Sequence, residues 1–222
     1  MQAAIATYQG RKTARQSSEQ RRLAILHAAL RVLIRDGVRG VRHRAVAKEA
    51  DVPLSATTYY FKDIHDLIAD AFALFTHETM QAFVDPFWSR AHDWIKTFPP
   101  GSRNNPAISA EITEHMSSMG ADYILTRVRE HREQLVVEHA FWYAALTDER
   151  MHEMALQHGH RLLGNFTRIL EYVGVNDVEL GAKSMLTTVR RLEYEGMVGA
   201  PGFSAENIKA ALVHQMRAVM AV

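Results

Sequence analysis

The sequence predicts an all-α protein with a small N-terminal head and a larger helical body, and two observations support this fold class. Apolar residues recur at steps of three and four along most of the 222-residue chain, which is the spacing of amphipathic helices. No stretch shows the sustained alternation of apolar and polar residues that a half-buried strand requires. Clusters of glycine and proline, of which residues 98–106 form the largest, separate the helical stretches from one another.

Composition excludes several classes of protein. The chain contains no cysteine, which excludes a thiolate nucleophile, a cysteine zinc site and a disulfide framework. No run of about 18 apolar residues predicts a membrane span, and the first ten residues lack the basic-then-apolar order of a secretory signal. We therefore expect a cytoplasmic protein without a membrane partner.

Charge is distributed unevenly along the chain. The formal net charge is only +1, but residues 1–62 carry 12 Lys and Arg against 4 Asp and Glu, whereas the remainder carries 14 against 21. This asymmetry indicates a basic head that binds a polyanion and an acidic body with another role. The alternative is an uneven surface charge that has no function.

The head is predicted to contain three helices that follow a basic arm. A first helix begins near Glu19 and ends at Gly37, and two short helices follow at about 44–50 and 55–60. A fourth, longer helix begins at about Asp63 and leads into the body. The predicted domains are a flexible basic arm (1–17), a head of three helices (18–62) and a larger helical body (63–222).

The body shows helical periodicity over most of its length, with breaks at Pro86 and at the proline-rich stretch described above. Gly120 is predicted to separate the first two of its later helices. The predicted segments are about 107–118, 121–146, 149–173, 177–197 and 204–220.

Two short helices joined by a tight turn, the second rich in Ser, Thr and Tyr, fit a helix that lies in the major groove of DNA. The stretch from Val46 to Leu67 reads VAKEADVPLSATTYYFKDIHDL, and it resembles the DNA-binding segment of the tetracycline-repressor (TetR) family. The resemblance covers about residues 20–75. It implies a dimeric transcriptional regulator, usually a repressor, whose body binds a small effector that changes its affinity for a double-stranded DNA operator.

The predicted DNA contacts combine cations for phosphates with hydroxyl groups for phosphates and base edges. The alternative for Tyr59 and Tyr60 is that one or both are core residues, and the alternative for Arg42 and Arg44 is that they are ordinary surface groups. The sequence departs from the family pattern at Asp51, which replaces a usual glycine, and at Thr58, which replaces a frequent tyrosine. The predicted contact residues are Arg42, His43, Arg44, Leu54, Ser55, Ala56, Thr57, Thr58, Tyr59, Tyr60 and Lys62.

The body is rich in methionine and aromatic residues, which suit an adaptable apolar pocket. Such a pocket favours an apolar or amphipathic effector, for example an acyl chain or an aromatic compound. Plain core packing is the alternative for each residue taken singly. The predicted effector-binding residues are Phe83, Phe87, Trp88, Trp94, Met116, Met119, Tyr123, Phe141, Trp142, Ala145 and Phe166.

The last two predicted helices offer more apolar surface than a terminal hairpin can bury by itself. Four such helices from two chains can close a bundle about a two-fold axis. The predicted homodimer contacts are Leu180, Met185, Val189, Leu192, Ile208, Leu212 and Met216.

The sequence supports two other functions less well. A helical di-iron enzyme needs two Glu-x-x-His pairs, but the chain has only one, formed by Glu149 and His152. A helical adaptor that binds only proteins leaves the basic arm and the Thr-Thr-Tyr-Tyr run unexplained. We therefore predict no catalytic residue, no metal ligand and no cofactor.

Overall fold

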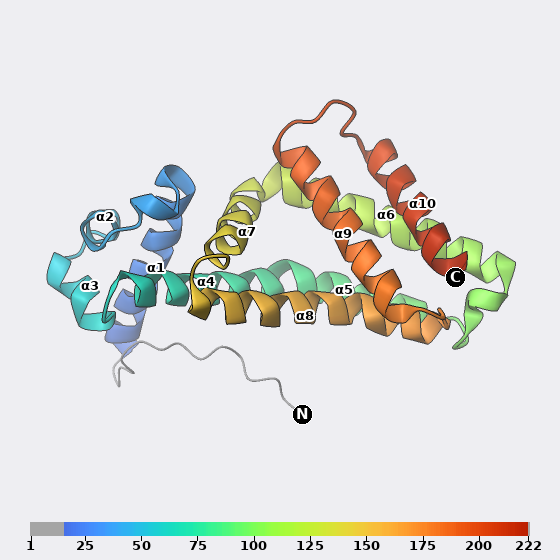
Figure 1. The fold of residues 1–222 in the computed structure, drawn as a ribbon, viewed down its shortest axis with the longest axis horizontal. Helices are drawn as coiled ribbons and strands as arrows, with labels where there is room; N and C mark the ends of the chain where they lie inside the picture. Colours follow the sequence, from blue (N-terminus) through green and yellow to red (C-terminus); the bar gives the residue numbers. More distant parts are fainter. Residues whose placement is uncertain (1–15, 222) are drawn as a thin grey trace. The chain divides into compact units, whose positions relative to one another are not determined.

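A computed structural model describes residues 16–221 of the chain, and these residues contain helices and no strand, as predicted. The predicted arm lies almost entirely outside the described residues. The helices are drawn in Figure 1. They are α1 (Gln16–Asp36), α2 (His43–Glu49), α3 (Leu54–Tyr60), α4 (Ile64–Thr79), α5 (Asp85–Ile95), α6 (Pro106–Glu130), α7 (Arg132–Ala144), α8 (Glu149–Val173), α9 (Val178–Met197) and α10 (Ala205–Ala221).

The chain forms two compact units, and it crosses between them three times. Unit 1 comprises the described residues up to Gln81 together with Val136–Gln157. Unit 2 comprises Ala82–Leu135 together with His158 and the residues that follow it. Unit 1 is thus larger than the predicted segment 18–62, because α4 and the hairpin of residues 136–157 contribute to the same core as the head.

The core of unit 1 forms where α1 packs against α2 and α4. Its centre contains fully buried apolar side chains such as Leu26, Phe61 and Phe72. The 136–157 hairpin adds Phe141, whose ring centroid lies 4.8 Å from that of Phe72. The hairpin is therefore part of the hydrophobic core and does not merely cover the head.

The turns of the head follow from particular residues. Gly37 ends α1 with a φ of 71°, and Asp51 adopts a φ of 52° between α2 and α3. Asp tolerates this left-handed conformation better than most residues, which explains how it can stand where the resembled family usually has glycine. Asp63 caps α4, since its carboxylate accepts a hydrogen bond from the backbone N–H of Asp66 at 2.9 Å.

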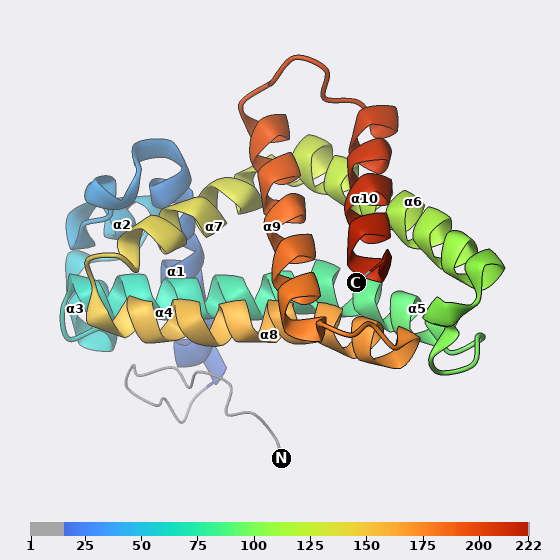
Figure 2. The same ribbon diagram turned by 45° about the vertical axis from the view of Figure 1, so that its right-hand side comes forward.

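Unit 2 is built around the long helix α6, which packs against both α9 and α10. Figure 2 shows α9 and α10 as an antiparallel hairpin beside α6. The predicted helix break at Gly120 is wrong, because α6 continues through this residue and ends at Glu130. Gly120 instead permits close packing, since a Cβ atom there would lie 3.0 Å from Leu212 Cδ1 of α10.

No helix within residues 16–221 combines the length and the apolar character that a membrane span requires. In the same range, no three His, Asp or Glu side chains come together in a way that could hold a metal ion.

Candidate nucleic-acid interface

The helix-turn-helix consists of two helices of seven residues each, α2 and α3. Val46 and Ala47 are buried on the inner side of α2, and such small side chains allow the two helix axes to approach closely. The backbone N–H of Val52 donates to the carbonyl of Ala47 at 3.0 Å and closes the turn between the helices.

Helix α3 has a buried side and an exposed side. Thr57 and Tyr60 are buried. Ser55 and Thr58 are exposed, and so are the larger side chains of Leu54 and Tyr59, which are 45% and 55% exposed. This outer side thus combines hydroxyl groups with apolar and aromatic surface on one short helix. The exposed side is therefore the candidate contact surface.

The structure corrects the prediction that Tyr60 contacts DNA. Its side chain is only 5% exposed, and its hydroxyl lies 2.8 Å from Ser18 Oγ of α1. Buried tyrosines usually find such a partner for the hydroxyl. Tyr60 therefore fixes α3 to α1, and Tyr59 packs edge-on against its ring with a centroid distance of 5.1 Å.

The structure also corrects the prediction for Thr57, whose exposure is 0%. Its hydroxyl donates to the carbonyl of Leu54 at 2.8 Å and lies 3.1 Å from Nδ1 of His43. Ala56 is half-buried. The sequence pattern could not separate these inward residues from their outward neighbours, because the whole run from Ala56 to Tyr60 is rich in hydroxyl groups.

Three predicted cations, Arg42, Arg44 and Lys62, are exposed. Among residues 16–221 no ion pair neutralises any of them. Arg39 and Lys48 are exposed in the same way, although they were not among the predicted contacts. A prediction that included every basic residue of the head would have found Arg39 and Lys48 as well.

Other arginines of the head are already neutralised. Arg31 and Arg35 of α1 each donate to the carboxylate of Glu49 at 2.8 Å. The hydrogen bonds from these two guanidinium groups lower the pKa of Glu49. This cluster joins α1 to the end of α2, so its charges support the head and leave the outer cations available for phosphates.

The start of α4 is connected to the loop before α8, within unit 1. Asp66 forms an ion pair with Arg150, and His65 Nδ1 lies 3.3 Å from a carboxylate oxygen of Asp148. The hydrogen bond with Asp66 raises the pKa of Arg150. The end of the helix-turn-helix is thus held by the hairpin of residues 136–157.

The predicted effector residues do not all come together. Phe141, Trp142 and Ala145 pack into the core of unit 1. The others belong to unit 2, where Trp88 lies 4.6 Å from Phe166 between ring centroids. The physical reason is that the hairpin of residues 136–157 shares its core with the head, which periodicity alone cannot reveal.

Four of the aromatic residues of unit 2, Phe87, Trp88, Tyr123 and Phe166, form a connected cluster, and Trp94 and Phe83 each pair with a histidine apart from it. Phe87 contacts both Trp88 and Tyr123, with centroid distances of 5.1 and 4.8 Å. Trp94 stacks on His115 at 3.9 Å, and Phe83 lies 4.3 Å from the ring of His131. Met116 is buried and Met119 is half-buried on α6.

A polar group accompanies this cluster. The ring of His92 lies 5.9 Å from that of Trp88, and its Nε2 atom is buried without a hydrogen-bond partner among the described residues. Burial of the ring lowers the pKa of His92, and the charge of Arg168 acts in the same direction. Burial therefore favours the neutral form of the ring more than it is favoured in a solvated histidine.

The predicted dimer contacts also need correction. Five of the seven are buried within the single chain, where α9 and α10 pack on α6: Met185, Leu192, Ile208, Leu212 and Met216. Val189 is half-buried, whereas Leu180 is 61% exposed. The apolar surface of the terminal hairpin is hidden by α6, whereas the predicted segments placed a break at Gly120 within this helix and joined its second half to α7.

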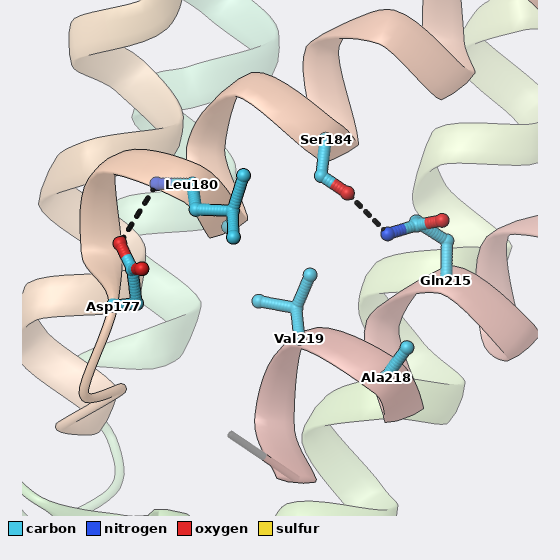
Figure 3. A pocket seen from close by; sticks show the side chains of 7 residues that line it. Asp177, Leu180, Ser184, Gln215, Ala218 and Val219 are labelled. Atoms are coloured by element: carbon cyan, nitrogen blue, oxygen red, sulfur yellow. Dashed lines mark hydrogen bonds between the residues drawn. The ribbon is translucent and has the colours of Figure 1, made fainter.

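A different face of α9 is open. Leu180, Tyr194 and Val198 are exposed large side chains, and they recur along one side of the helix with Ser184, Thr187 and Arg191 between them. Figure 3 shows a cavity of about 170 Å³ beside Leu180, between α9 and α10. It is lined by Asp177, Leu180, Gly181, Ser184, Gln215, Ala218 and Val219.

Comparisons with known proteins place the fold. No protein-family model matches the chain, and no curated protein matches its sequence. The solved structures do match. A member of the TetR family from Streptomyces coelicolor A3 is 22% identical, with a TM-score of 0.62 over 88% of this chain and 98% of that one.

Two further structures are similar at the same level. A putative transcriptional regulator from Saccharomonospora viridis in complex with choline is 16% identical, with a TM-score of 0.64 over 87% of this chain and 94% of that one. The multidrug binding protein EbrR complexed with ethidium is 21% identical, with a TM-score of 0.61 over 88% of this chain and 98% of its own. The chain therefore has the fold of the TetR-family transcriptional regulators.

Proposed function

We propose that the protein is a DNA-binding transcriptional regulator of the TetR type, a repressor whose affinity for its operator changes when a small molecule binds. The observation that carries this proposal is the outer side of α3, where Ser55, Thr58 and Tyr59 are exposed close in sequence to the unpaired cations Arg42, Arg44 and Lys62. The fold it shares with known regulators supports the proposal. Its place of action is the cytoplasm, where its DNA target would lie.

In this proposal α3 enters the major groove and reads base edges through its exposed hydroxyl groups, while the cations bind phosphates. Tyr59 supplies a large amphipathic surface for the same contact. Phosphate contacts give affinity for any DNA, whereas the α3 side chains give preference for one sequence.

A homodimer follows from the need to read two half-sites, because one short helix contacts only a few base pairs. We propose that the open face of α9, with Leu180, Tyr194 and Val198, meets the same face of a second chain. These three side chains share one side of the helix with the polar residues Ser184, Thr187 and Arg191, and such a mixed face can pack against its own copy in a four-helix bundle. This face replaces the buried residues of the initial prediction.

We propose that the effector binds unit 2 at its aromatic cluster. Phe87, Trp88 and Phe166 offer apolar and π surfaces, and His92 offers a polar atom without a partner. An amphipathic molecule would satisfy both. Choline and ethidium occupy two proteins of the same fold, so an aromatic or quaternary cation should be tested beside an acyl-type molecule.

DNA binding is tested by fluorescence anisotropy with the region upstream of the gene and with unrelated DNA. Tyr59→Ala should weaken binding to the specific fragment by about 1 to 3 kcal/mol and leave unrelated DNA unaffected. Arg44→Ala should weaken binding to both and reduce the salt dependence. A folded Tyr59→Ala/Thr58→Ala/Arg44→Ala variant that binds like the wild type would contradict the proposal.

Effector binding is tested by titrating the DNA complex with decanoyl-carnitine, ethidium and choline while tryptophan fluorescence is recorded. Trp88→Phe and Phe166→Leu should weaken the response, and Trp142→Phe in unit 1 is the matched control. A response that Trp142→Phe removes and Trp88→Phe preserves would place the effector outside the unit 2 cluster.

A further inference from the structure

A hydrogen bond crosses the helix-turn-helix at its centre. Nδ1 of His43, the first residue of α2, lies 3.1 Å from Oγ1 of Thr57 in α3. Thr57 is completely buried, and its hydroxyl donates to the carbonyl of Leu54 at 2.8 Å. A hydroxyl has one hydrogen to donate, so toward His43 it can only accept. The proton of the neutral ring must therefore be on Nδ1.

This tautomer limits what His43 can offer to DNA. With Nδ1–H directed at Thr57, the neutral ring presents only an acceptor at Nε2, and a phosphate oxygen requires a donor. Thr57 is buried and its hydroxyl is already paired. Both residues were predicted to contact DNA, but their geometry points to a different role.

Tyr60 ties the end of α3 to α1 through Ser18, and Glu49 ties the end of α2 to α1, but neither contact links α2 directly to α3. Each of these two helices has only seven residues, and neither has a side-chain hydrogen bond at its N-cap, which is Arg42 in α2 and Pro53 in α3. Helices this short are not stable alone, so contacts between them must fix their geometry. The apolar contacts around Val46 do not define a rotation, whereas a hydrogen bond is directional.

We propose that His43 and Thr57 are positioning residues that set the rotation of α3 about its axis and so determine which of its side chains reach DNA. The inference rests on the proposed DNA binding. Successive residues of a helix are about 100° apart, so a Thr57 anchored inward places Ser55 and Tyr59 on the opposite side. A rotated α3 would leave the phosphate contacts of Arg42, Arg44 and Lys62 in place and would lose its own alignment with base edges.

Two matched pairs of variants test this role. Thr57→Ser keeps the hydroxyl and Thr57→Val removes it at nearly the same size. His43→Asn keeps an N–H donor near the position of Nδ1, whereas His43→Gln moves the amide group away. We expect Thr57→Val and His43→Gln each to weaken specific DNA binding about five- to tenfold, and the Ser and Asn variants to remain within about twofold.

The double variant His43→Gln/Thr57→Val should bind specific DNA no more weakly than the worse single variant, because both remove one interaction. Affinity for unrelated DNA and its salt dependence should stay unchanged in all variants. Additive losses, or equal losses on both kinds of DNA, would overturn the positioning role. Circular dichroism and thermal unfolding identify any variant that fails to fold, and the Ser and Asn variants then carry the test.

The tautomer is measured without DNA. Nitrogen-15 chemical shifts of the His43 ring at pH 8 should identify a protonated Nδ1 in the wild type, and a protonated Nε2 would overturn the inference. A wild-type chain that binds no specific DNA would contradict the proposed function, and the ring shifts distinguish this failure from the absence of the hydrogen bond.

Discussion

The two units hold their helices together in different ways. In unit 1 the contacts are directional: Arg22 and Asp70 form a buried ion pair at 2.6 Å, and Glu49 joins α2 to α1 through two arginines. In unit 2 aromatic rings and closely packed helices predominate, and the buried pair of Arg127 and Glu193 is longer, at 3.8 Å.

The difference suits the proposed roles. Ion pairs and hydrogen bonds fix distance and angle, so they can hold a DNA-reading helix in one orientation. Aromatic contacts tolerate several arrangements at similar energy, so they can open and close again around a ligand. We therefore expect unit 1 to be sensitive to the loss of single polar groups and unit 2 to be sensitive to changes in volume.

The largest effect is expected at the ion pair of unit 1. Asp70→Asn removes the closer carboxylate from the buried guanidinium of Arg22, which keeps Glu19 at 3.4 Å. The free energy of unfolding should therefore fall by about 2 to 4 kcal/mol, somewhat less than for a fully uncompensated buried charge. Urea unfolding followed by circular dichroism measures this change. Arg22→Met/Asp70→Leu removes both charges and should lose much less. A loss below about 1 kcal/mol for Asp70→Asn would remove the basis of the comparison.

Volume is tested in unit 2 with two glycines. A Cβ atom at Gly181 would lie 2.9 Å from Val219 Cγ1 and 3.1 Å from Leu170 Cδ1, so Gly181→Ala should destabilise the protein by about 1 to 3 kcal/mol. Gly164 lies within α8 and has no atom within 4 Å of such a Cβ. Gly164→Ala should therefore stabilise it by about 0.5 to 1 kcal/mol. Equal effects at both positions would show that helix propensity, not packing, decides the outcome.

A smaller effect should appear at His92 of unit 2 near neutral pH. Because burial lowers the pKa of this ring below its ordinary value of 6.5, the unfolded chain binds a proton more readily than the folded one. The contribution of His92 to the free energy of unfolding should be fully present above about pH 6.5. It should be lost as the pH falls through the lower pKa of the folded state. The urea midpoint of the wild type should therefore decrease between pH 8 and pH 5, and it should decrease less in His92→Gln. If the urea midpoint depends on pH equally in both proteins, groups other than His92 cause the dependence.

The smallest effect is expected at Glu49, which is near the surface of unit 1. Arg31 and Arg35 lower the pKa of its carboxyl from 4.5, so its contribution is present above about pH 4.5 and is lost as the pH falls through the lower folded value. Glu49→Gln should flatten the acid limb of the stability profile at low salt and have less effect at 1 M NaCl. A flattening that is the same at both salt concentrations would argue against an ion-pair origin.

The fold class and most helix bounds could be predicted because they depend on local patterns. Spacing of apolar residues and turn residues such as Gly37 and Asp63 act within a few positions. Gly120 misled the prediction because glycine signals both a helix end and a close helix contact, and only the position of Leu212 distinguishes the two.

The candidate sites were harder to predict because they depend on which core each helical face joins. Phe141 belongs to unit 1, and Met216 packs within its own chain, but periodicity shows only that both are apolar. Thr57 and Tyr59 are both polar residues of one short helix. Their opposite orientations depend on partners on α1 and α2, which are distant in the sequence.

The discontinuity of unit 1 affects the order of events during synthesis. A nascent chain that ends at Gln81 lacks Phe141 and the other core residues of the 136–157 hairpin. At about 5 to 20 residues per second, the ribosome needs roughly 4 to 15 s to reach the end of this hairpin. During that time α2 and α3 have an incomplete core, so a polypeptide that already contains the whole helix-turn-helix would be poorly able to perform the proposed DNA binding and would be exposed to chaperones and proteases.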